Sequence, residues 1–245
     1  MWMSSSRHSA AQCATLESNP ARVSATLSGL FPAGVVAAEL RSPASPALLT
    51  SEERASVAHC GRERVLDFAA GRTCARRALQ EFGVSGFSLI AAADRQPLWP
   101  PALVGSITHT DGYYAAVVGE RRLWRSLGVD VERIDALRAD LWPCICATAE
   151  LEILHALSPA RRPLAAALMF VAKEAFFKCQ FPITQARLGF DEAVVESTDW
   201  GARAGSFRIT LPRRAVSAQS YLRWEGHFRR LDEFMAAGMA LPTLP

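Results

Sequence analysis

The residues of this sequence best placed to do chemistry are three carboxylates and a lysine on two regular segments. In LGVDVERI, Leu127–Ile134, aliphatic residues alternate with polar ones, which predicts a strand that carries Asp130 and Glu132 on one face. In MFVAKEAFFK, Glu174 and Lys178 are four residues apart and therefore share one side of a predicted helix. Magnesium prefers oxygen ligands and usually takes a few carboxylates together with substrate phosphate and water. The pattern suits a magnesium ion and a phosphate-bearing substrate, although solvated faces on both elements are the commoner case.

The helix that must position Glu174 has an apolar stripe at helical spacing. The stripe consists of Leu164, Leu168, Val171, Ala172, Ala175 and Cys179. Pro163 falls in the first turn, where proline is tolerated, and Pro182 is expected to end the helix. Upstream, Thr148 is expected to cap a further helix.

Basic residues gather in an earlier predicted helical region, Glu53–Phe82, which begins after a capping threonine and acids in the first turn. Arg64 and Arg72 are eight residues apart, a little over two turns, so both can reach one ligand if the helix continues through Gly71. Arg76 adds a third cation one turn further on. The local pattern alone favours a solvated basic face over a shared ligand.

Strands and a rigid loop are predicted between the two helical regions. The loop DRQPLWPP contains three prolines, which restrict its backbone and can hold Arg95 in place. Strands are expected at Phe87–Ala91, Leu103–Thr108 and Tyr113–Gly119, and the last two form an antiparallel meander with the LGVDVERI strand. The turn HTDG places His109 at a strand end, where it can contact an anion, although a solvated histidine is the commoner case.

Helices followed by strands occur twice along the chain, which predicts an α+β fold of two similar halves. Further strands are expected within 22–40 and at Phe190–Glu196, Phe207–Leu211 and Ala218–Phe228, and a short helix with a loose tail at Asp232–Pro245. We therefore divide the chain into a disordered leader (residues 1–20), an N-terminal α+β half (21–122) and a C-terminal α+β half (123–245).

The composition is that of a soluble globular protein, with 50% hydrophobic and 21% charged residues. The formal net charge of +3 gives no global signal for nucleic acid. No apolar run approaches the roughly 20 residues of a membrane span, and the first residues lack the order of a signal peptide. The six cysteines are scattered, which indicates reduced thiols. We expect a cytoplasmic monomer with neither nucleic acid nor a membrane as partner.

The chain resembles the 4′-phosphopantetheinyl transferases of the surfactin-synthetase type in four segments that occur in a fixed order. These are GRTCARRAL, RQPLWPPALVGSITHT, LGVDVERI and MFVAKEAFFK. Within that type the enterobactin synthetase component D branch is the most similar, and the similarity runs from about Glu63 to Asp191. Each acidic motif is weak alone, whereas both in order after W-P…G-S-x-x-H are specific.

The resemblance implies a pseudo-dimer of two α+β halves with coenzyme A and magnesium in the cleft between them. The magnesium ligands would be Asp130, Glu132 and Glu174. Glu174 would also be the general base, and phosphate would be contacted by Lys178, with Lys173 nearby. The coenzyme A site, chiefly its 3′-phosphate and pyrophosphate, would be lined by Arg64, Arg72, Arg95 and His109, with polar contacts from Ser106 and Thr108. Thr108 replaces a common serine and Arg95 a common lysine, so the hydroxyl and the charge are kept.

The activity implied is transfer of 4′-phosphopantetheine from coenzyme A to a serine of an apo acyl or peptidyl carrier protein, in siderophore or secondary metabolite biosynthesis. Attack on a pyrophosphate requires charge neutralisation by a metal and cations, which this residue set can supply. Two alternatives remain. Another magnesium-dependent phosphate-ester enzyme would leave the arginines unexplained, and a non-catalytic protein that binds coenzyme A or a carrier would leave the acids and Lys178 unexplained.

Overall fold

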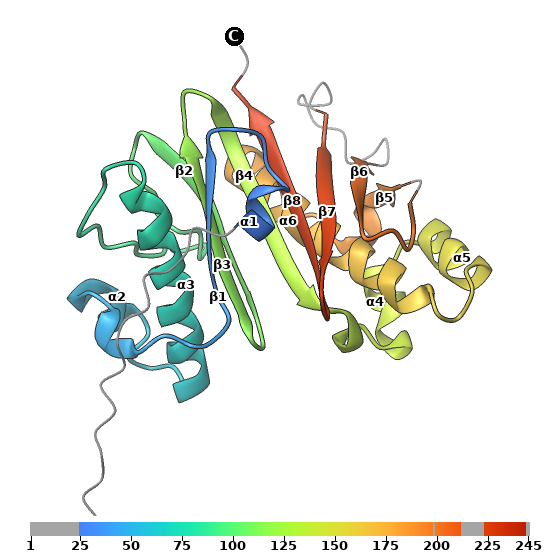
Figure 1. Ribbon diagram of the computed structural model, residues 1–245, viewed down its shortest axis with the longest axis horizontal. Coiled ribbons are helices and arrows are strands. Elements are labelled where there is room, and N and C mark those ends of the chain that lie inside the picture. The colour runs from blue at the N-terminus through green and yellow to red at the C-terminus, as the bar shows by residue number, and fades with distance from the viewer. Residues whose placement is uncertain (1–24, 198, 212–222, 244–245) are drawn as a thin grey trace, which may run out of the picture.

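The computed structural model describes residues 25–197, 199–211 and 223–243, which form two β-sheets with a long helix packed on each (Figure 1). The strands are β1 (Val35–Leu40), β2 (Leu103–Thr110), β3 (Tyr113–Glu120), β4 (Trp124–Arg133), β5 (Val194–Glu196), β6 (Ala204–Thr210), β7 (Glu225–Leu231) and β8 (Phe234–Pro242). The helices are α1 (Ala25–Ser28), α2 (Ser51–Ser56), α3 (Arg62–Gln80), α4 (Trp142–Ile145), α5 (Thr148–Ala156) and α6 (Arg162–Thr184). Short 3-10 turns occur at η1 (Pro46–Leu48), η2 (Ile134–Ala136), η3 (Ala139–Leu141) and η4 (Phe190–Glu192). The predicted α+β class is confirmed.

The first sheet is antiparallel, with β3 between β1 and β2. Helix α3 packs on one face through small residues such as Ala70 and Ala78 and through Leu79. The other face, with Ala115 and Val117 of β3, shares a buried cluster with residues of β4 and β8. Because β3 is covered on both faces, its sequence YYAAVVG is apolar throughout rather than alternating.

The second sheet has the order β4-β8-β7-β6-β5, with antiparallel pairing throughout. Helix α6 lies across β4 and β8 and buries the predicted apolar stripe in the larger core (Figure 1). The approach to β4 is close: a Cβ on Gly128 would lie 1.9 Å from the carbonyl oxygen of Ala175. Glycine at this position therefore allows α6 to bring Glu174 and Lys178 beside the acidic strand.

The two sheets meet where β2 runs beside β4, and we call this contact the β2–β4 seam. Ser106 Oγ accepts a hydrogen bond from Val129 N at 3.2 Å, and Thr108 Oγ1 accepts one from Val131 N at 3.4 Å. Both bonds join residues at the same sequence offset, so the two strands run in the same direction. The predicted antiparallel pairing of β2 with β3 is confirmed, whereas the extension of that meander to β4 is wrong: β4 pairs with β8, and side-chain hydroxyls rather than backbone carbonyls join it to β2.

Several local predictions also need correction. The segment Phe87–Ala91 is not a strand and contributes only an isolated bridge from Ala91 to Pro97. Gly71 does not break α3. Helix α6 passes through Pro182 and ends at Gln185, which has a left-handed backbone. Residue Thr148 is the first of α5 rather than its cap.

The C-terminal segment differs most from the expectation. Residues predicted as a short helix and a tail form β8, which pairs with both β4 and β7. The sequence FMAAGMALP is buried on both faces, so it lacks the polar alternation that marks a half-exposed strand. The predicted 190–196 strand shortens to β5, while β6 and β7 lie in the regions expected.

Three predictions fall wholly or partly outside the described residues. These are the leader over residues 1–20, the first part of the strand predicted at 218–228, and the last two residues of the tail. The predicted boundary near residues 120–126 coincides with the connection from β3 to β4, and the division into two halves stays a prediction. Within the described ranges, no helix combines the length and apolar character needed to cross a membrane.

Candidate active site

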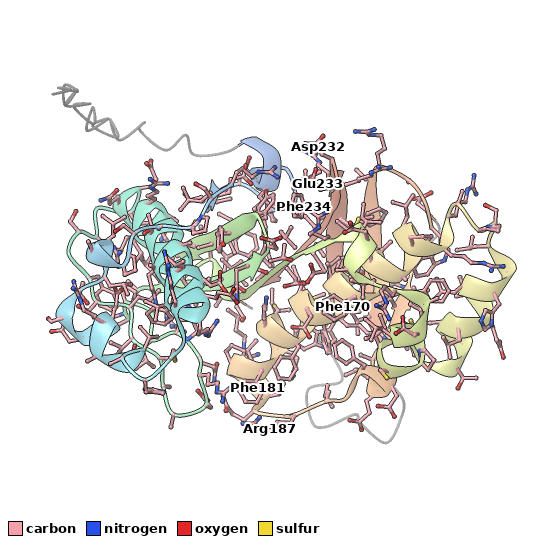
Figure 2. All side chains as sticks on the ribbon, turned by 90° about the horizontal axis from the view of Figure 1, so that it is seen from below. Phe170, Phe181, Arg187, Asp232, Glu233 and Phe234 are labelled. Carbon is pink, nitrogen blue, oxygen red and sulfur yellow. The ribbon has the colours of Figure 1, made fainter. Side chains whose placement is uncertain are left out.

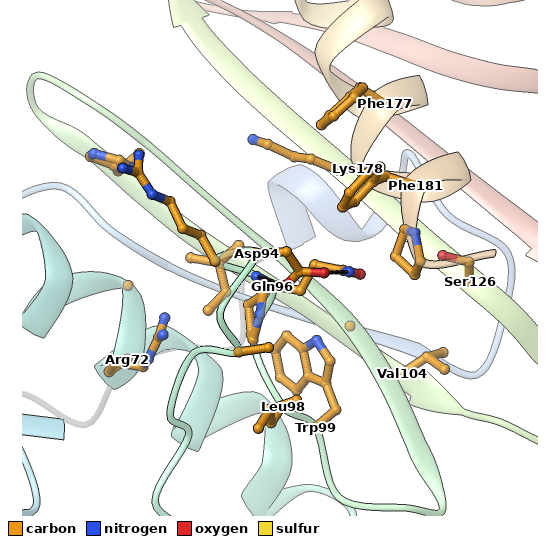
Figure 3. Close-up of a pocket in the computed structure, with 18 of the residues that line it drawn as sticks. Arg72, Asp94, Gln96, Leu98, Trp99, Val104, Ser126, Phe177, Lys178 and Phe181 are labelled. Atoms are coloured by element: carbon orange, nitrogen blue, oxygen red, sulfur yellow. Dashed lines mark hydrogen bonds between the residues drawn. The ribbon is translucent and has the colours of Figure 1, made fainter. Parts of the chain in front are cut away.

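A cavity of about 830 Å³ lies between α3, β2, the proline-rich loop and the C-terminal part of α6. Figure 3 shows Phe177, Lys178 and Phe181 projecting from α6 on one side, and Arg72, Leu98 and Trp99 on the opposite side. Seen from below, Phe181 and Arg187 lie at the edge of the molecule opposite to Asp232 in the β7–β8 turn (Figure 2). Among the predicted site residues, the cavity brings together Arg64, Arg72, Arg95, His109 and Lys178.

Arg72 is the most buried cation of the cavity wall, with 6% of the residue exposed. Its Nε donates to the carbonyl oxygen of Leu89 at 2.6 Å, and its guanidinium stacks on the Phe68 ring at 4.1 Å from the centroid. Burial lowers the pKa of Arg72 to about 10, which still leaves it charged at neutral pH. A buried guanidinium without a carboxylate against it is a strong attractor for an anion in the cavity.

Arg64 lies two turns before Arg72 on α3 and faces β2. Its Nη1 is 3.4 Å from Nε2 of His109, and the same histidine nitrogen is 3.8 Å from Oδ2 of Asp67. The hydroxyl of Tyr114 donates to the other oxygen of Asp67 at 3.2 Å. Burial, together with the positive charge of Arg64, lowers the pKa of His109, so the ring is neutral at pH 7.

The proline-rich loop closes the cavity on the side away from α6. Arg95 has a φ of 73°, a left-handed backbone that non-glycine residues rarely adopt. Asp94 accepts hydrogen bonds from the backbone N and the side-chain Nε2 of Gln96, which fix the turn (Figure 3). Trp99 packs directly over Gly105 of β2, where an added Cβ would be 2.7 Å from its ring. The loop is therefore anchored to β2, as a rigid support for Arg95.

The acidic side of the site begins at Asp130, which is 6% exposed. Its Oδ1 accepts a hydrogen bond from Thr108 Oγ1 at 2.8 Å and forms an ion pair with Lys178 Nζ at 2.7 Å. Lys178 Nζ also donates to the carbonyl oxygen of Val129 at 3.2 Å. The lysine on α6 is thus bound to the acidic strand, as the four-residue spacing from Glu174 allowed.

The other two acids, Glu132 and Glu174, are half-buried and have raised pKa values. Burial, and to a smaller extent the charge of Asp130, raise the pKa of Glu174, which Lys178 partly offsets. Burial also raises the pKa of Glu132, although hydrogen bonds from Thr110 Oγ1 and from Arg133 N oppose this. Asp130 therefore lies within electrostatic range of both glutamates.

These three acids fit a magnesium ion by donor type. Hard oxygen donors on two rigid elements are the ligands Mg²⁺ prefers, and a cation would offset the burial, and the smaller repulsion from Asp130, that raise both glutamate pKa values. Among the described residues, however, no three His, Cys, Asp or Glu side chains are gathered closely enough to hold a metal. The ammonium of Lys178 forms an ion pair with Asp130.

Three predicted contact residues lie elsewhere. Ser106 and Thr108 are buried in the β2–β4 seam, on the face of β2 opposite to Gly105, Ile107 and His109, which line the cavity. Lys173 is 3% exposed and pairs with Glu150 at 2.5 Å, while its Nζ also donates to two backbone carbonyl oxygens. Because its ammonium is buried and its hydrogens are used, Lys173 cannot contact a phosphate in the cavity.

Sequence reasoning missed other residues of the cavity wall. Asp67 is three residues after Arg64, so helical spacing could have placed both beside one ligand. Phe177 and Phe181, four residues apart on α6, stack with their ring centroids 5.2 Å apart and give the cavity an aromatic wall. Arg121 and Arg125 line the end of the cavity near the β3–β4 connection, a position no local pattern predicts.

Family models and known proteins match most of this chain. Residues 52–119 match the family model described as 4′-phosphopantetheinyl transferase N-terminal domain, and residues 126–231 match that of the 4′-phosphopantetheinyl transferase superfamily. The 4′-phosphopantetheinyl transferase PptT of Mycobacterium tuberculosis is 37% identical over 62% of this chain and 68% of its own length. The 4′-phosphopantetheinyl transferase Svp of Streptomyces mobaraensis is 33% identical over 79% of each chain, and enterobactin synthase component D of Salmonella typhi is 40% identical over 76% of each. The chain therefore belongs to the 4′-phosphopantetheinyl transferase superfamily and is a transferase of that family.

Proposed function

We propose that this transferase holds coenzyme A along the cavity and moves its 4′-phosphopantetheine group to a serine of an apo carrier protein, which releases 3′,5′-ADP. One observation carries the proposal: a single cavity joins the buried cation Arg72 at one wall to Lys178, and through Lys178 to Asp130, at the other. Coenzyme A carries a 3′-phosphate and a pyrophosphate, so a molecule of this kind needs cations at both places.

The nucleotide end of coenzyme A is assigned to the basic wall. Arg64, Arg72, Arg95 and His109 come from α3, the proline-rich loop and the end of β2, so they converge from three sides. Arginine binds phosphate oxygens through two parallel hydrogen bonds, and the stacking of Arg72 on Phe68 leaves the guanidinium edge available for this. His109, neutral when the site is empty, would gain a proton beside a phosphate.

The pyrophosphate end is assigned to the acids. Asp130, Glu132 and Glu174 would hold a magnesium ion, which supplies charge neutralisation to the phosphates when bound. Lys178 lines the cavity and is ion-paired with Asp130, so its ammonium is placed between the acids and an anion in the cavity. The carboxylates on β4 are held by hydroxyls of β2, which keeps their oxygens in place before substrate arrives.

Glu174 is assigned the proton transfer. Burial raises its pKa, which makes its carboxylate a better proton acceptor than an exposed glutamate. It would accept the proton of the carrier serine while the serine oxygen attacks the β-phosphorus, and the bond from that phosphorus to the 3′,5′-ADP oxygen breaks. Lys178 would stabilise the negative charge that remains on the leaving diphosphate.

Mass spectrometry tests the whole assignment. An apo carrier protein incubated with the enzyme, coenzyme A and MgCl₂ should gain about 340 Da on its serine, and none when that serine is alanine. Chelation with EDTA should stop the gain, and excess MgCl₂ should restore it. If no member of a panel of apo carrier proteins gained this mass, the proposal would be contradicted.

Finer features are also proposed. We infer that the enzyme is of the surfactin-synthetase type, works in the cytoplasm as a monomer, and serves a carrier of siderophore or secondary metabolite synthesis. The support is the sequence similarity to enterobactin synthase component D and the order of the four motifs. The same panel tests this, because an enzyme of that type should load peptidyl carriers at rates similar to acyl carriers.

A further inference from the structure

A fully buried carboxylate, Glu53, holds together the N-terminal half behind the cavity. Its side chain accepts hydrogen bonds from Thr50 N at 3.1 Å and from Leu89 N at 3.0 Å. Arg76 Nη1 bonds both of its oxygens, at 2.8 and 2.6 Å, and Arg76 Nη2 donates to the carbonyl oxygen of Leu48 at 2.7 Å. Each lone-pair direction of the carboxylate is therefore used, and Arg76 is committed to it rather than to a ligand.

The same contacts lead to the cavity through one residue. The backbone N of Leu89 donates a hydrogen bond to Glu53, and its carbonyl oxygen accepts one from Arg72 Nε. Ser88 adds a bond from its hydroxyl to Thr50 Oγ1 at 2.9 Å, so this otherwise irregular segment is fixed to the start of α2. Within the described residues, Arg72 donates one hydrogen bond, to the carbonyl oxygen of Leu89. Its other guanidinium hydrogens are available to a ligand.

The C-terminal half contains a similar buried carboxylate, Glu150, whose described contacts do not reach the cavity. Glu150, also fully buried, accepts from the backbone N of Ala147 three residues earlier and from Val195 N at 2.8 Å. Lys173 of α6 takes the place that Arg76 of α3 takes beside Glu53. The two carboxylates share chemistry, burial and position in a short helix, but no residue held by Glu150 contacts a cavity cation among the described contacts.

We propose that Glu53, locked by Arg76, is a positioning residue that sets the orientation of Arg72 toward the phosphates of coenzyme A. The inference rests on the proposed function, in which Arg72 contacts that substrate. An arginine side chain has a long flexible stem, and a guanidinium fixed before binding loses less freedom when the ligand arrives. Glu53 also supplies the negative charge that helps to keep Arg72 ionised in its buried place. The structure thus assigns to Arg76 a role in affinity without any contact with the ligand.

Calorimetric titration of coenzyme A into four proteins tests the proposal: wild type, Glu53→Gln, Arg72→Ala and the double variant. Glu53→Gln keeps the shape but presents an amide NH₂ where one oxygen accepted a bond, so the Leu89 peptide and Arg72 should lose their fixed position. We expect its dissociation constant to rise about tenfold, equal to about 1.4 kcal/mol. In the Arg72→Ala background the same change should weaken binding no further. In assays with carrier, KM for coenzyme A should rise while kcat is retained.

Glu150→Gln is the matched control. It should lower the midpoint of thermal unfolding as Glu53→Gln does, and it should leave the affinity for coenzyme A unchanged. Equal loss of affinity in both glutamine variants, or a full effect of Glu53→Gln in the Arg72→Ala background, would overturn the positioning role. Wild-type affinity in Arg72→Ala would instead overturn the proposed substrate contact itself. If Glu53→Gln does not fold, Arg76→Gln, changed at a side chain 18% exposed, should give the same Arg72-dependent loss.

Discussion

At the scale of single residues, the site consists of ionisable side chains that are largely buried. Asp130 is bonded to both a hydroxyl and an ammonium, while Glu174 has a raised pKa because it is buried beside Asp130. His109 and Arg72 have lowered pKa values for the same reason. Burial makes each of these groups respond strongly to a new charge nearby, which is what a phosphate or a metal would bring.

A substitution of Glu174 can distinguish its role in proton transfer from a role in binding. Glu174→Gln keeps the shape and one oxygen but cannot accept the serine proton at neutral pH. We expect near-normal affinity for coenzyme A by calorimetry and a turnover number about 10²-fold lower or more, because general-base catalysis is typically of that size. Steady-state assays across a range of MgCl₂ provide the measurement. If high magnesium restores wild-type turnover, Glu174 is a ligand alone and not the base.

His109 predicts a pH effect of definite sign. Because burial lowers its pKa, the ring is neutral in the free enzyme just below pH 7, and a bound phosphate would raise the pKa again. Binding of coenzyme A near pH 6.5 should therefore take up more protons in wild type than in His109→Gln. Calorimetry in two buffers of different ionisation enthalpy measures this difference. Equal proton uptake in both proteins would show that His109 is not beside a phosphate.

At the scale of elements, the function depends on how closely α6 approaches β4. The spacing of Glu174 and Lys178 predicted one helical face, and the alternation in LGVDVERI predicted one strand. The distance between them is set by Gly128, against which the Ala175 carbonyl packs. A methyl group there would push the helix away from the acids.

Gly128→Ala is expected to destabilise the protein by at least the roughly 1–3 kcal/mol of ordinary overpacking, since the clash is with backbone. It should also reduce transfer activity in the fraction that stays folded, because Lys178 and Glu174 would move from Asp130. Urea unfolding and activity per folded molecule measure the two effects. Gly61→Ala, at a position open to solvent, is the control, and equal behaviour of the two variants would contradict the argument.

Local pattern was sufficient for some elements and not for others. Short-range spacing predicted the capped helix start at Thr50 and the helix that carries Glu174 and Lys178, and the structure confirms both. It did not predict the break between α2 and α3, and it ended α6 too early, at Pro182. The partner of β4 could not be read in this way, because β8 lies about a hundred residues away and is apolar on both faces. The same applies to Lys173, whose burial is explained by its ion pair with Glu150, and to the hydroxyls of β2, whose hydrogen-bond partners lie on another sheet.

At the scale of the whole molecule, each half carries its own buried ion pair, and the two differ in what they support. Arg76 with Glu53 lies behind the cavity, whereas Lys173 with Glu150 ties α6 to α5 and β5. The C-terminal pair is completed by carbonyl oxygens of Ile145 and Phe190. We therefore assign Lys173 to the stability of the C-terminal half.

Lys173→Met should destabilise the fold by about 3–5 kcal/mol, because it leaves Glu150 buried without its partner. At a temperature where the variant is folded, its affinity for coenzyme A should equal that of wild type. Lys178→Met should lose transfer clearly and destabilise the fold less than Lys173→Met, because Lys178 is partly exposed and Asp130 keeps the hydrogen bond from Thr108. Denaturant unfolding and calorimetry make both measurements. Weaker coenzyme A binding by folded Lys173→Met would return Lys173 to the phosphate site.

The β2–β4 seam has a consequence for how such an enzyme can diversify. Residues of β2 alternate between two faces: Ser106 and Thr108 bond the acidic strand, while Gly105, Ile107 and His109 line the cavity. A shift of this strand by a single residue would exchange the two sets, and would remove a hydroxyl from Asp130 and His109 from the cavity at once. Residues of β2 can therefore be substituted, but the register of the strand against β4 must stay the same. Insertions that change specificity must accumulate in the loops at its ends.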